Sequence, residues 1–294
     1  MSHQWKNWLV TAACLCAMGT HGSGAGRSLV VTTVDFPGAV FTNVQGINAV
    51  GDLVGFYTDT AGKTHGFLRS GDQFRSIDFP NAGLTQARGI GPAGDIVGSY
   101  QKPNESGGVP AHGFLLTRRG GFFQVDYPGH LNTIAQRILP DGTVLGCYHD
   151  TDTMGSMHGM EYRRGFSAIP EEMSMNNGAT PDRRLVVGLF TDMDGRGKAY
   201  TIDRDVFRAL EVPGAAFTAG WDVNPSGVIV GVYADAAGVF HGFYYDGQAF
   251  GRVDVAGARA TRVFGVNDAG DMVGAFVDAS GRTHGLLAQW VAVP

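Results

Sequence analysis

The amino-acid sequence predicts an all-β fold, a six-bladed β-propeller with four strands in each blade. Three observations predict it: a motif that recurs six times, four short apolar segments in every copy, and chain ends that complement each other. In each copy a Gly-x-aromatic element follows a turn by 18 residues, as Gly55 follows Pro37. The glycines are Gly55, Gly98, Gly146, Gly188, Gly231 and Gly274, and the turns are centred on Pro37, Pro80, Pro128, Pro170, Pro213 and Ala256. Self-similarity at a fixed period is typical of repeat architectures.

Each copy spans about 43 residues and holds four short apolar segments separated by turn signals. In the first copy we expect strands at 42–48, 52–58, 64–70 and 73–79, named a to d in chain order. These segments are rich in Val, Ile, Phe, Tyr and Thr and are bounded by Gly, Asp, Asn and Pro, which is typical of strands and turns. Four strands in about 40 to 45 residues is the size of one propeller blade.

The two ends of the chain predict how the ring closes. Residues 29–37 resemble a strand d but have no blade before them, and the sixth copy ends after its strand c. We therefore expect the N-terminal strand to complete the last blade, which removes two open sheet edges at once.

Residues 1–27 differ from the repeats and are predicted to be a signal peptide, followed by a single propeller domain at 28–294. Lys6 precedes a short apolar run at 8–18 and then a stretch of small residues, the pattern of a secretory signal. A disordered tail is the alternative, and lipid attachment at Cys14 is a weaker one. No other segment is long and apolar enough to span a bilayer. The protein is thus expected to be secreted, to the periplasm or the cell exterior.

Charge and cysteine content limit the kinds of partner and covalent link that we expect. The net charge is −5 and the charges are dispersed without a basic patch, so nucleic acid is not an expected partner. Cys147 is the only cysteine beyond the predicted signal peptide, so no intramolecular disulfide can form. Its place in an apolar strand indicates a buried, unreactive thiol. We expect a monomer.

The repeat resembles a known family. Residues 46–57 read GINAVGDLVGFY and residues 64–68 read THGFL. This pattern resembles the HAF-repeat family, bacterial extracellular proteins named for a His-Ala-Phe motif. The motif is His-Gly-Phe at His65, His112 and His241, and it becomes His-Gly-Met at His158 and His-Gly-Leu at His284. The resemblance covers essentially residues 30–290 and implies an exported protein, but the family has no settled activity that would assign site residues.

The repeated histidines and aspartates are interpreted as structural. A ring places the five histidines in separate blades, where each can hydrogen-bond a turn or a neighbouring blade; the fourth copy has Lys198 instead. Asp59, Asp235 and Asp278 each stand three residues before a glycine, the spacing of a tight turn.

Function is expected where the repeat is broken, on loops that the regular blades hold in place. In a propeller the d–a and b–c loops share one face, and departures on that face gather in blades 2 to 4. Blade 2 has a long b–c loop at 101–111. Blade 3 carries His130 in its d–a loop and His149, Asp150 and Asp152 in its b–c loop, and we predict these four as ligand-binding residues.

The innermost strands supply a second set of candidates. Nine residues after the turn, four copies have a small residue, which suits a crowded axis: Gly46, Gly89, Ala179 and Gly265. Arg137 and Asp222 break this rule in blades 3 and 5, and Trp221 adjoins Asp222. These three are predicted to contact a ligand near a channel mouth, although Arg137 and Asp222 can equally pair with each other or with a neighbouring blade.

No metal or cofactor is predicted, but two patterns keep calcium open. Asp192 and Asp194 resemble part of a short calcium loop that lacks its distal glutamate, and His149, Asp150, Asp152 and His158 are suitable ligand types. A solvated acidic hairpin is the alternative. The sequence also contains none of the linear signatures G-x-S-x-G, H-E-x-x-H, the Walker loop or C-x-x-C.

The expected function is a secreted binding scaffold, not an enzyme, whose ligand is an extracellular carbohydrate, a cell-surface polymer or a protein. A multivalent lectin would repeat its binding residues in every blade; here the repeated residues look structural, which favours a single site on blades 2 to 4. The alternative is an extracellular hydrolase or lyase that uses His130, Arg137, His149 and Asp150. It requires these side chains to converge.

Overall fold

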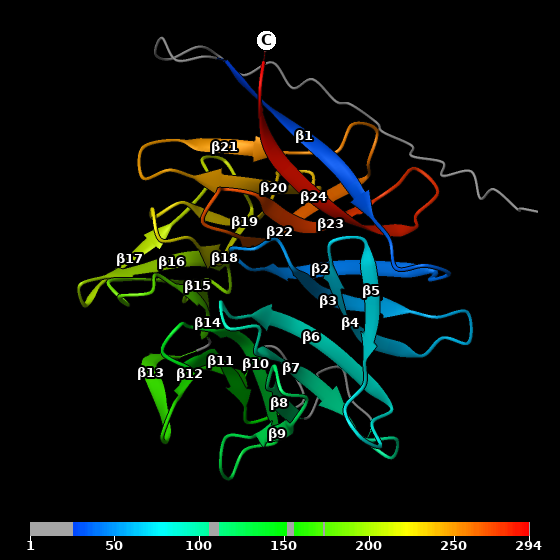
Figure 1. Cartoon of the computed structure of the whole chain (residues 1–294). Coiled ribbons are helices and arrows are strands. Elements are labelled where there is room, and N and C mark those ends of the chain that lie inside the picture. The colour runs from blue at the N-terminus through cyan, green and yellow to red at the C-terminus, as the bar shows by residue number, and fades with distance from the viewer. Residues whose placement is uncertain (1–25, 106–111, 152–155, 173, 294) are drawn as a thin grey trace, which may run out of the picture.

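A computed structural model describes residues 26–105, 112–151, 156–172 and 174–293, and it confirms the six-bladed propeller (Figure 1). Six four-stranded antiparallel sheets surround one axis. In five of them the strands follow chain order from the centre outwards, and in the sixth the N-terminal strand forms the outer edge. The strands predicted in the first copy are present within two residues of the expected bounds. The described residues contain no α-helix, and none of their segments is a helix that could cross a membrane.

The strands of each blade follow in the order a to d. Blade 1 holds β2 (Phe41–Ile47), β3 (Leu53–Thr58), β4 (Thr64–Ser70) and β5 (Gln73–Ile77). Blade 2 holds β6 (Leu84–Ile90), β7 (Ile96–Gln101), β8 (His112–Leu116) and β9 (Phe122–Val125). Blade 3 holds β10 (Asn132–Ile138), β11 (Val144–His149), β12 (Met157–Tyr162) and β13 (Phe166–Glu172). Blade 4 holds β14 (Ser174–Ala179), β15 (Leu185–Thr191), β16 (Gly197–Asp203) and β17 (Val206–Leu210). Blade 5 holds β18 (Phe217–Val223), β19 (Ile229–Ala234), β20 (Phe240–Tyr245) and β21 (Phe250–Val253). Blade 6 holds β22 (Ala260–Val266), β23 (Met272–Val277), β24 (Thr283–Ala292) and β1 (Arg27–Val34).

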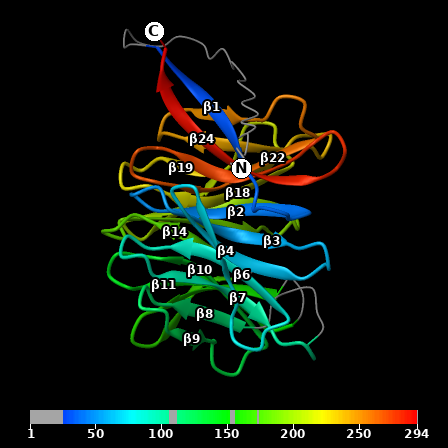
Figure 2. The same cartoon turned by 45° about the vertical axis from the view of Figure 1, so that its right-hand side comes forward.

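Blade 6 is completed by the N-terminal strand, as the chain ends predicted. β1 pairs antiparallel with β24 from Arg27 opposite Ala292 to Val34 opposite Gly285. The two strands run side by side in both views of the ribbon (Figures 1 and 2). Because β24 would otherwise be an open edge, this pairing joins the two ends of the ring with a ladder of backbone hydrogen bonds.

The repeated glycine of strand b is required by close packing within the blade. A Cβ atom at Gly55 would stand 2.0 Å from the carbonyl oxygen of Asn43 and 2.9 Å from the ring of Phe67. Phe67 is the aromatic residue of the His-Gly-Phe motif and lies opposite Gly55 in the ladder, fully buried. The two repeated motifs therefore fit together: the glycine leaves the space that the aromatic ring fills.

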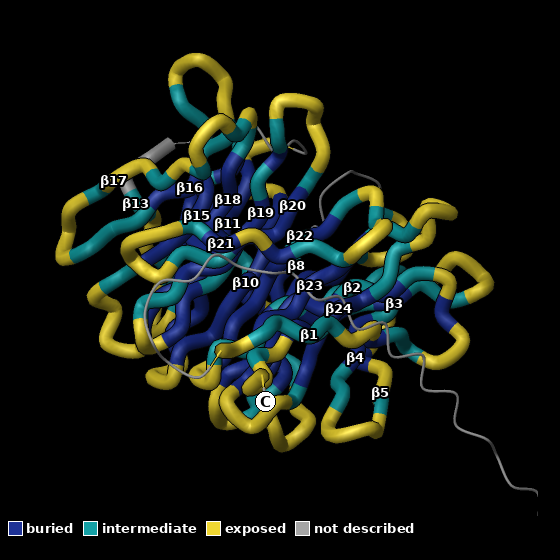
Figure 3. Tube along the Cα trace, turned by 90° about the horizontal axis from the view of Figure 1, so that it is seen from above, coloured by how far each residue is buried: buried dark blue, intermediate teal, exposed yellow. Residues whose placement is uncertain are grey.

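The core lies in the inner strands and between the blades, whereas the loops at both faces are exposed (Figure 3). Apolar side chains from neighbouring sheets form shared clusters. Ile77 at the outer edge of blade 1, for example, packs with Ala87 and Phe114 of blade 2. Burial between sheets is the principal stabilising contribution in such a ring.

Blade 4 departs from the sequence prediction. Pro170 does not form a turn but lies inside β13, which runs on to Glu172. Strand a of blade 4 is shifted by one residue, so that Gly178, not Ala179, takes the place equivalent to Gly46. The 18-residue spacing survives because the a–b turn is one residue longer. Its closing hydrogen bond joins Thr180 N to Leu185 O, whereas blade 1 joins Asn48 N to Asp52 O.

Candidate functional site

Every strand a contains a β-bulge at the same level of the ring. One residue in each strand is left without a ladder partner, and the strand bends there. We call these six the bulge residues: Gln45, Arg88, Gln136, Asn177, Trp221 and Phe264. Four of them line one cavity, while three of the residues that directly follow a bulge residue, Gly46, Arg137 and Asp222, line another. The bulges thus divide the axial channel into two mouths.

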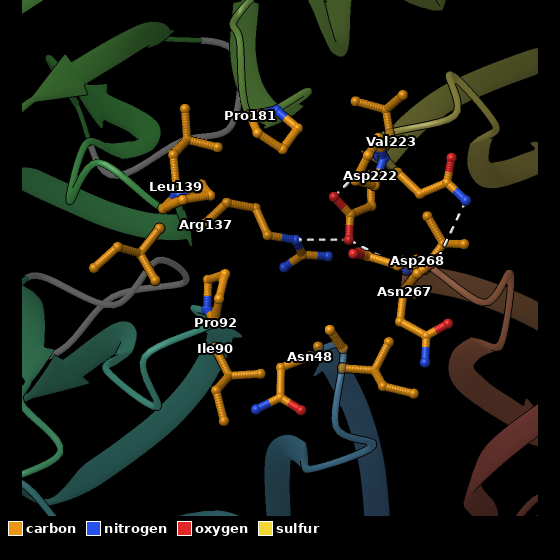
Figure 4. Close-up of a pocket in the computed structure, with 18 of the residues that line it drawn as sticks. Asn48, Ile90, Pro92, Arg137, Leu139, Pro181, Asp222, Val223, Asn267 and Asp268 are labelled. Carbon is orange, nitrogen blue, oxygen red and sulfur yellow. Dashed lines mark hydrogen bonds and ion pairs between the residues drawn. The ribbon is translucent and has the colours of Figure 1, made fainter.

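An ion pair between Arg137 and Asp222 lines the second of these cavities (Figure 4). Arg137 extends from blade 3 towards Asp222 of blade 5, and its Nε atom is 3.2 Å from the Oδ2 atom of Asp222. Asp222 also accepts hydrogen bonds from the backbone N–H of Val223 at 2.9 Å and of Val266 at 3.2 Å. Burial raises the pKa of Asp222, and the charge of Arg137 opposes that shift. The pairing that the sequence left open is confirmed.

The guanidinium of Arg137 also ties blades together through backbone carbonyl groups. Nη1 donates to the carbonyl oxygen of Arg88 at 2.8 Å, and Nη2 donates to that of Gln45 at 3.0 Å and to that of Phe264. These acceptors belong to blades 2, 1 and 6, and the side chain is only 8% exposed. Arg137 and Asp222 therefore act as a structural tie across the axis, with their polar atoms directed at the protein.

The cavity beside this ion pair that opens between the a–b loops is called here the a–b mouth. It has a volume of about 180 Å³ and is lined by loop residues that include prolines and asparagines (Figure 4). The asparagines hold their own turns: Oδ1 of Asn48 accepts from the N–H groups of Val50 and Asp52, and Oδ1 of Asn224 accepts from those of Ser226 and Val228. The side-chain oxygens of these two asparagines therefore stabilise the a–b loops.

The opposite cavity, called here the aromatic mouth, opens on the side of the d–a and b–c loops. It has a volume of about 330 Å³. Its walls come from blades 1, 2, 5 and 6: Gln45, Phe56, Gln86, Arg88, Phe217, Trp221, Val232, Phe240, Arg262 and Phe264. Trp221 meets Phe264 edge to face with ring centroids 5.3 Å apart, and the guanidinium of Arg262 lies over the ring of Phe240 at 4.3 Å. Aromatic walls with a few convergent polar groups are typical of ligand sites.

Arg88 is the most firmly positioned polar group of the aromatic mouth. Its Nε donates to Ser99 Oγ at 3.0 Å, Nη2 to Gln86 Oε1 at 2.6 Å, and Nη1 to Gln136 Oε1 at 3.4 Å. All three acceptors are neutral, so they orient the guanidinium without cancelling its charge. Burial lowers the pKa of Arg88 to about 10, and the neighbouring charge of Arg137 adds to that shift.

The other predicted site residues do not converge. His130 and Asp150 pair with each other, 2.6 Å between Nδ1 and Oδ1, and Oδ2 of Asp150 is 2.8 Å from Nε2 of His158. His149 is fully buried with its Nε2 3.4 Å from the Sγ of Cys147. Asp152 lies outside the described residues, as does most of the long loop at 101–111. Of the six predicted residues that the structure describes, Trp221 alone lines the aromatic mouth.

Cys147 has the environment that its sequence position indicated. It is fully buried, and burial raises the pKa of its thiol to about 12. A thiol with so little thiolate at neutral pH is a weak nucleophile.

The repeated histidines hold the outer parts of the blades together. His65 places Nδ1 2.7 Å from Asp78, beyond strand d, and Nε2 3.4 Å from Asp59, in the b–c turn. Blades 2, 5 and 6 repeat this arrangement. In blade 4 Lys198 replaces the histidine and makes the same bridge, 3.2 Å from Asp192 and 3.1 Å from Glu211.

The weak calcium pattern in blade 4 is occupied by the protein's own groups. Oδ1 of Asp192 accepts hydrogen bonds from the N–H groups of Asp194 and Arg196, and Oδ2 faces Lys198. These contacts compete with a cation. Among the described residues no group of three His, Cys, Asp or Glu side chains has the geometry of a metal site.

Sequence reasoning missed Arg88 and Arg262 as well as most of the aromatic wall. The informative position in strand a lies one residue before the position nine residues after the turn, which the sequence comparison used. Aligning the residue just before Gly46 and its equivalents would have shown Gln45, Arg88, Gln136, Trp221 and Phe264 as a variable polar and aromatic set. Arg262 had no comparable signal, because it is two residues away from the bulge on β22.

Solved structures with a similar fold are distant in sequence. A gluconolactonase from Xanthomonas campestris superposes with a TM-score of 0.58 at 12% identity, covering 95% of this chain and 98% of that one. TolB from Acinetobacter baumannii gives 0.57 at 14% identity, covering 82% and 66%. The six-bladed, fucose-recognising lectin of Aleuria aurantia gives 0.54 at 10% identity, covering 87% and 99%. The chain matches no family model and no curated protein. At these identities the likeness shows the shared propeller fold.

Proposed function

We propose that this protein is an exported binding scaffold that holds an extracellular carbohydrate in the aromatic mouth. The observation that carries the proposal is the cavity itself: about 330 Å³, walled by half-buried aromatic rings and provided with glutamine and arginine side chains. Aromatic faces pack against the apolar faces of sugar rings, while amide and guanidinium groups hydrogen-bond hydroxyl groups. A volume near 300 Å³ is the lower end of the range for ligand pockets and suits a short saccharide or the end of a chain.

A single axial site differs from the multivalent arrangement in which each blade binds its own sugar. The walls come from four blades, and Trp221 has the non-aromatic residues Gln45, Arg88, Gln136 and Asn177 in its place in blades 1 to 4. The likeness to a lectin in complex with α-methyl-L-fucoside adds only that a six-bladed ring of this kind can present a sugar site. One molecule of this protein should therefore bind one saccharide.

The hydrolase or lyase alternative has less support. It requires His130, Arg137, His149 and Asp150 to meet at one place. His130 and Asp150 do meet, but Arg137 is committed to Asp222 and backbone carbonyl groups, and His149 is buried beside Cys147. Binding without turnover is the better account of this geometry.

Export and family membership stay predictions. The signal-like segment 1–27 lies almost entirely outside the described residues, with β1 starting at Arg27. The resemblance to HAF-repeat proteins rests on the motifs quoted above.

The first test is a glycan and polysaccharide array on the purified mature protein, with and without calcium. We expect saccharide binding that Trp221→Ala weakens about tenfold or more, as is usual for a central aromatic anchor. Phe123→Ala is the matched control, because Phe123 is 56% exposed on β9 at the outer rim and should leave binding unchanged. An array without any bound saccharide would overturn the proposal, and conversion of a bound saccharide would favour the enzyme. Saccharide binding that is lost when calcium is removed would support the calcium site at Asp192 and Asp194.

A further inference from the structure

Two arginine side chains in the aromatic mouth carry charges that the protein leaves unbalanced. Arg88 of blade 2 and Arg262 of blade 6 both line the cavity, and blade 1 lies between them in the ring. In the part of the chain that the structure describes, no carboxylate faces either guanidinium. Among the described residues, the ionisable groups that act on Arg88 are the Cys147 thiol, which is neutral at pH 7 because burial raises its pKa, and the like charge of Arg137. For Arg262 the only influence is burial, which lowers its pKa.

The contrast with Arg137 in the same channel makes this arrangement informative. Arg137 is neutralised by Asp222 at 3.2 Å, so the fold does supply a carboxylate where a buried guanidinium is structural. An unpaired charge in a partly buried position is destabilising, and it persists where another partner compensates for it. Among the described residues no such partner faces Arg88 or Arg262 at the aromatic mouth, so a ligand that carries negative charge is the partner that fits there.

The geometry of the two groups favours a planar, bidentate anion. Arg88 is oriented by the neutral oxygens of Gln86, Ser99 and Gln136. Arg262 is oriented by its position over the ring of Phe240. A fixed guanidinium fork matches the two oxygens of a carboxylate, and such charge-assisted pairs are stronger than neutral hydrogen bonds.

We propose that the aromatic mouth binds a carboxylated sugar, a uronic-acid residue of an acidic polysaccharide, with Arg88 and Arg262 receiving its negative charge and Trp221 packing against its ring. This rests on the proposed function and specifies its ligand class. The aromatic wall from blade 5 takes the apolar face of the sugar, while the arginines on either side of blade 1 take the acid group. Oε1 of Gln45 and Nε2 of Gln86 remain as hydrogen-bonding groups for hydroxyls, because Nε2 of Gln45 donates to Asn43 and Oε1 of Gln86 accepts from Arg88.

The test compares three ligands on the purified mature protein by titration calorimetry. They are a tri-galacturonate, the same trisaccharide with its carboxyl groups reduced to alcohols, and a sulfated disaccharide. We expect the acid to bind about tenfold to a hundredfold more tightly than its reduced counterpart, the range for hydrogen bonds to a charged group. The affinity should fall with rising salt, because part of the attraction is electrostatic.

Variants of Arg262 test the assignment of the charge. Arg262→Gln should lose the preference for the acid, and Arg262→Lys should keep part of it, because the charge remains while the bidentate fork is lost. Arg75→Gln, which removes an exposed arginine on β5, is the matched control and should bind as the unmodified protein does. Thermal unfolding of each variant confirms that it is folded.

The outcomes separate the two proposals. Equal binding of acid and reduced trisaccharide, unaffected by Arg262→Gln, would overturn the carboxylate assignment and leave the carbohydrate site standing. Binding of the sulfated sugar alone would replace the carboxylate with a sulfate. Failure of every saccharide to bind would overturn both proposals.

Discussion

The two mouths of the channel share strands of blades 1, 2, 5 and 6 and yet differ in the interactions that their polar groups make. At the a–b mouth the asparagines cap their own turns, and Arg137 and Asp222 satisfy each other. At the aromatic mouth no carboxylate of the described residues faces the guanidinium groups of Arg88 and Arg262, and mostly half-buried aromatic rings stand around them. One step along strand a separates Gln45 from Gly46. The bulge therefore determines which residue of strand a faces the aromatic mouth, where we propose the ligand binds, and which faces the a–b mouth.

The largest effect is expected from opening the ring, because both mouths depend on its closure. Deleting Arg27–Val34 removes the partner of β24 and exposes its inner positions such as Leu286 and Ala288. The loss should be comparable with the whole stability of a domain, about 5–15 kcal/mol. Thermal unfolding monitored by circular dichroism checks it. An unchanged melting temperature would mean that the ring does not need β1.

Breaking the tie between Arg137 and Asp222 should have the next largest effect. Asp222→Asn leaves Arg137 buried without a counter-charge, which costs about 3–5 kcal/mol in comparable pairs. Urea unfolding measures the loss. The double variant Arg137→Met with Asp222→Asn should be less destabilised than Asp222→Asn alone, since no uncompensated charge remains. Asp72→Asn, at an exposed turn, is the control. Equal midpoints for Asp222→Asn and the unmodified protein would show that the tie is not structural.

A fall in pH should destabilise the face that carries the b–c loops before it destabilises the face that carries the a–b loops. In every blade the pKa of one carboxyl in the b–c loop, or at its start, is lowered: Asp59, Glu105, Asp150, Asp192, Asp235 and Asp278. For Asp59 the main cause is the backbone hydrogen bond from Lys63, and for Asp150 the hydrogen bonds from His158 and then His130. A carboxyl with a lowered folded-state pKa stabilises the fold above its ordinary value of 3.8, and this contribution is lost as the pH falls through the folded-state value.

The measurement is amide hydrogen exchange between pH 5 and about pH 3, corrected for intrinsic rates. Protection should fall first in the b–c loops, where six blades contribute. On the opposite face the lowered carboxyls are confined to Asp141, Asp182 and Asp246 among the described residues. Uniform loss of protection on both faces would contradict this smallest and most local of the three effects.

The architecture could be read from the chain because its causes are local and repeated. A glycine that lies too close to a strand-a carbonyl oxygen to carry a Cβ atom recurs in every strand b, and the turn residues recur at fixed spacing, so six copies reinforce one interpretation. The surplus strand at one end and the missing strand at the other predicted the closure. The prediction failed in blade 4, where a longer a–b turn offset a shifted strand and left the residue count unchanged.

The candidate site could be predicted only in part. Trp221, Arg137 and Asp222 were identified because they interrupt or adjoin the run of small residues nine positions after the turn. That pattern does not predict the direction in which their side chains point. Arg88 and Arg262 were not identified, since an arginine in a strand gives no indication of whether a carboxylate will face it.

The sequence therefore determines the blades and their number, because strand pairing and glycine packing within a blade act between near neighbours in sequence. It also predicts how the ring closes, because a surplus strand near the N-terminus matches the strand that the last blade lacks. The composition of the axial channel depends instead on residues that are distant in sequence. Arg137 hydrogen-bonds the carbonyl of Phe264, 127 residues away, and the aromatic mouth draws on four blades. Which side chains meet at the axis, and which charges are left for a ligand, is set by the closed ring, which brings distant strands to one level.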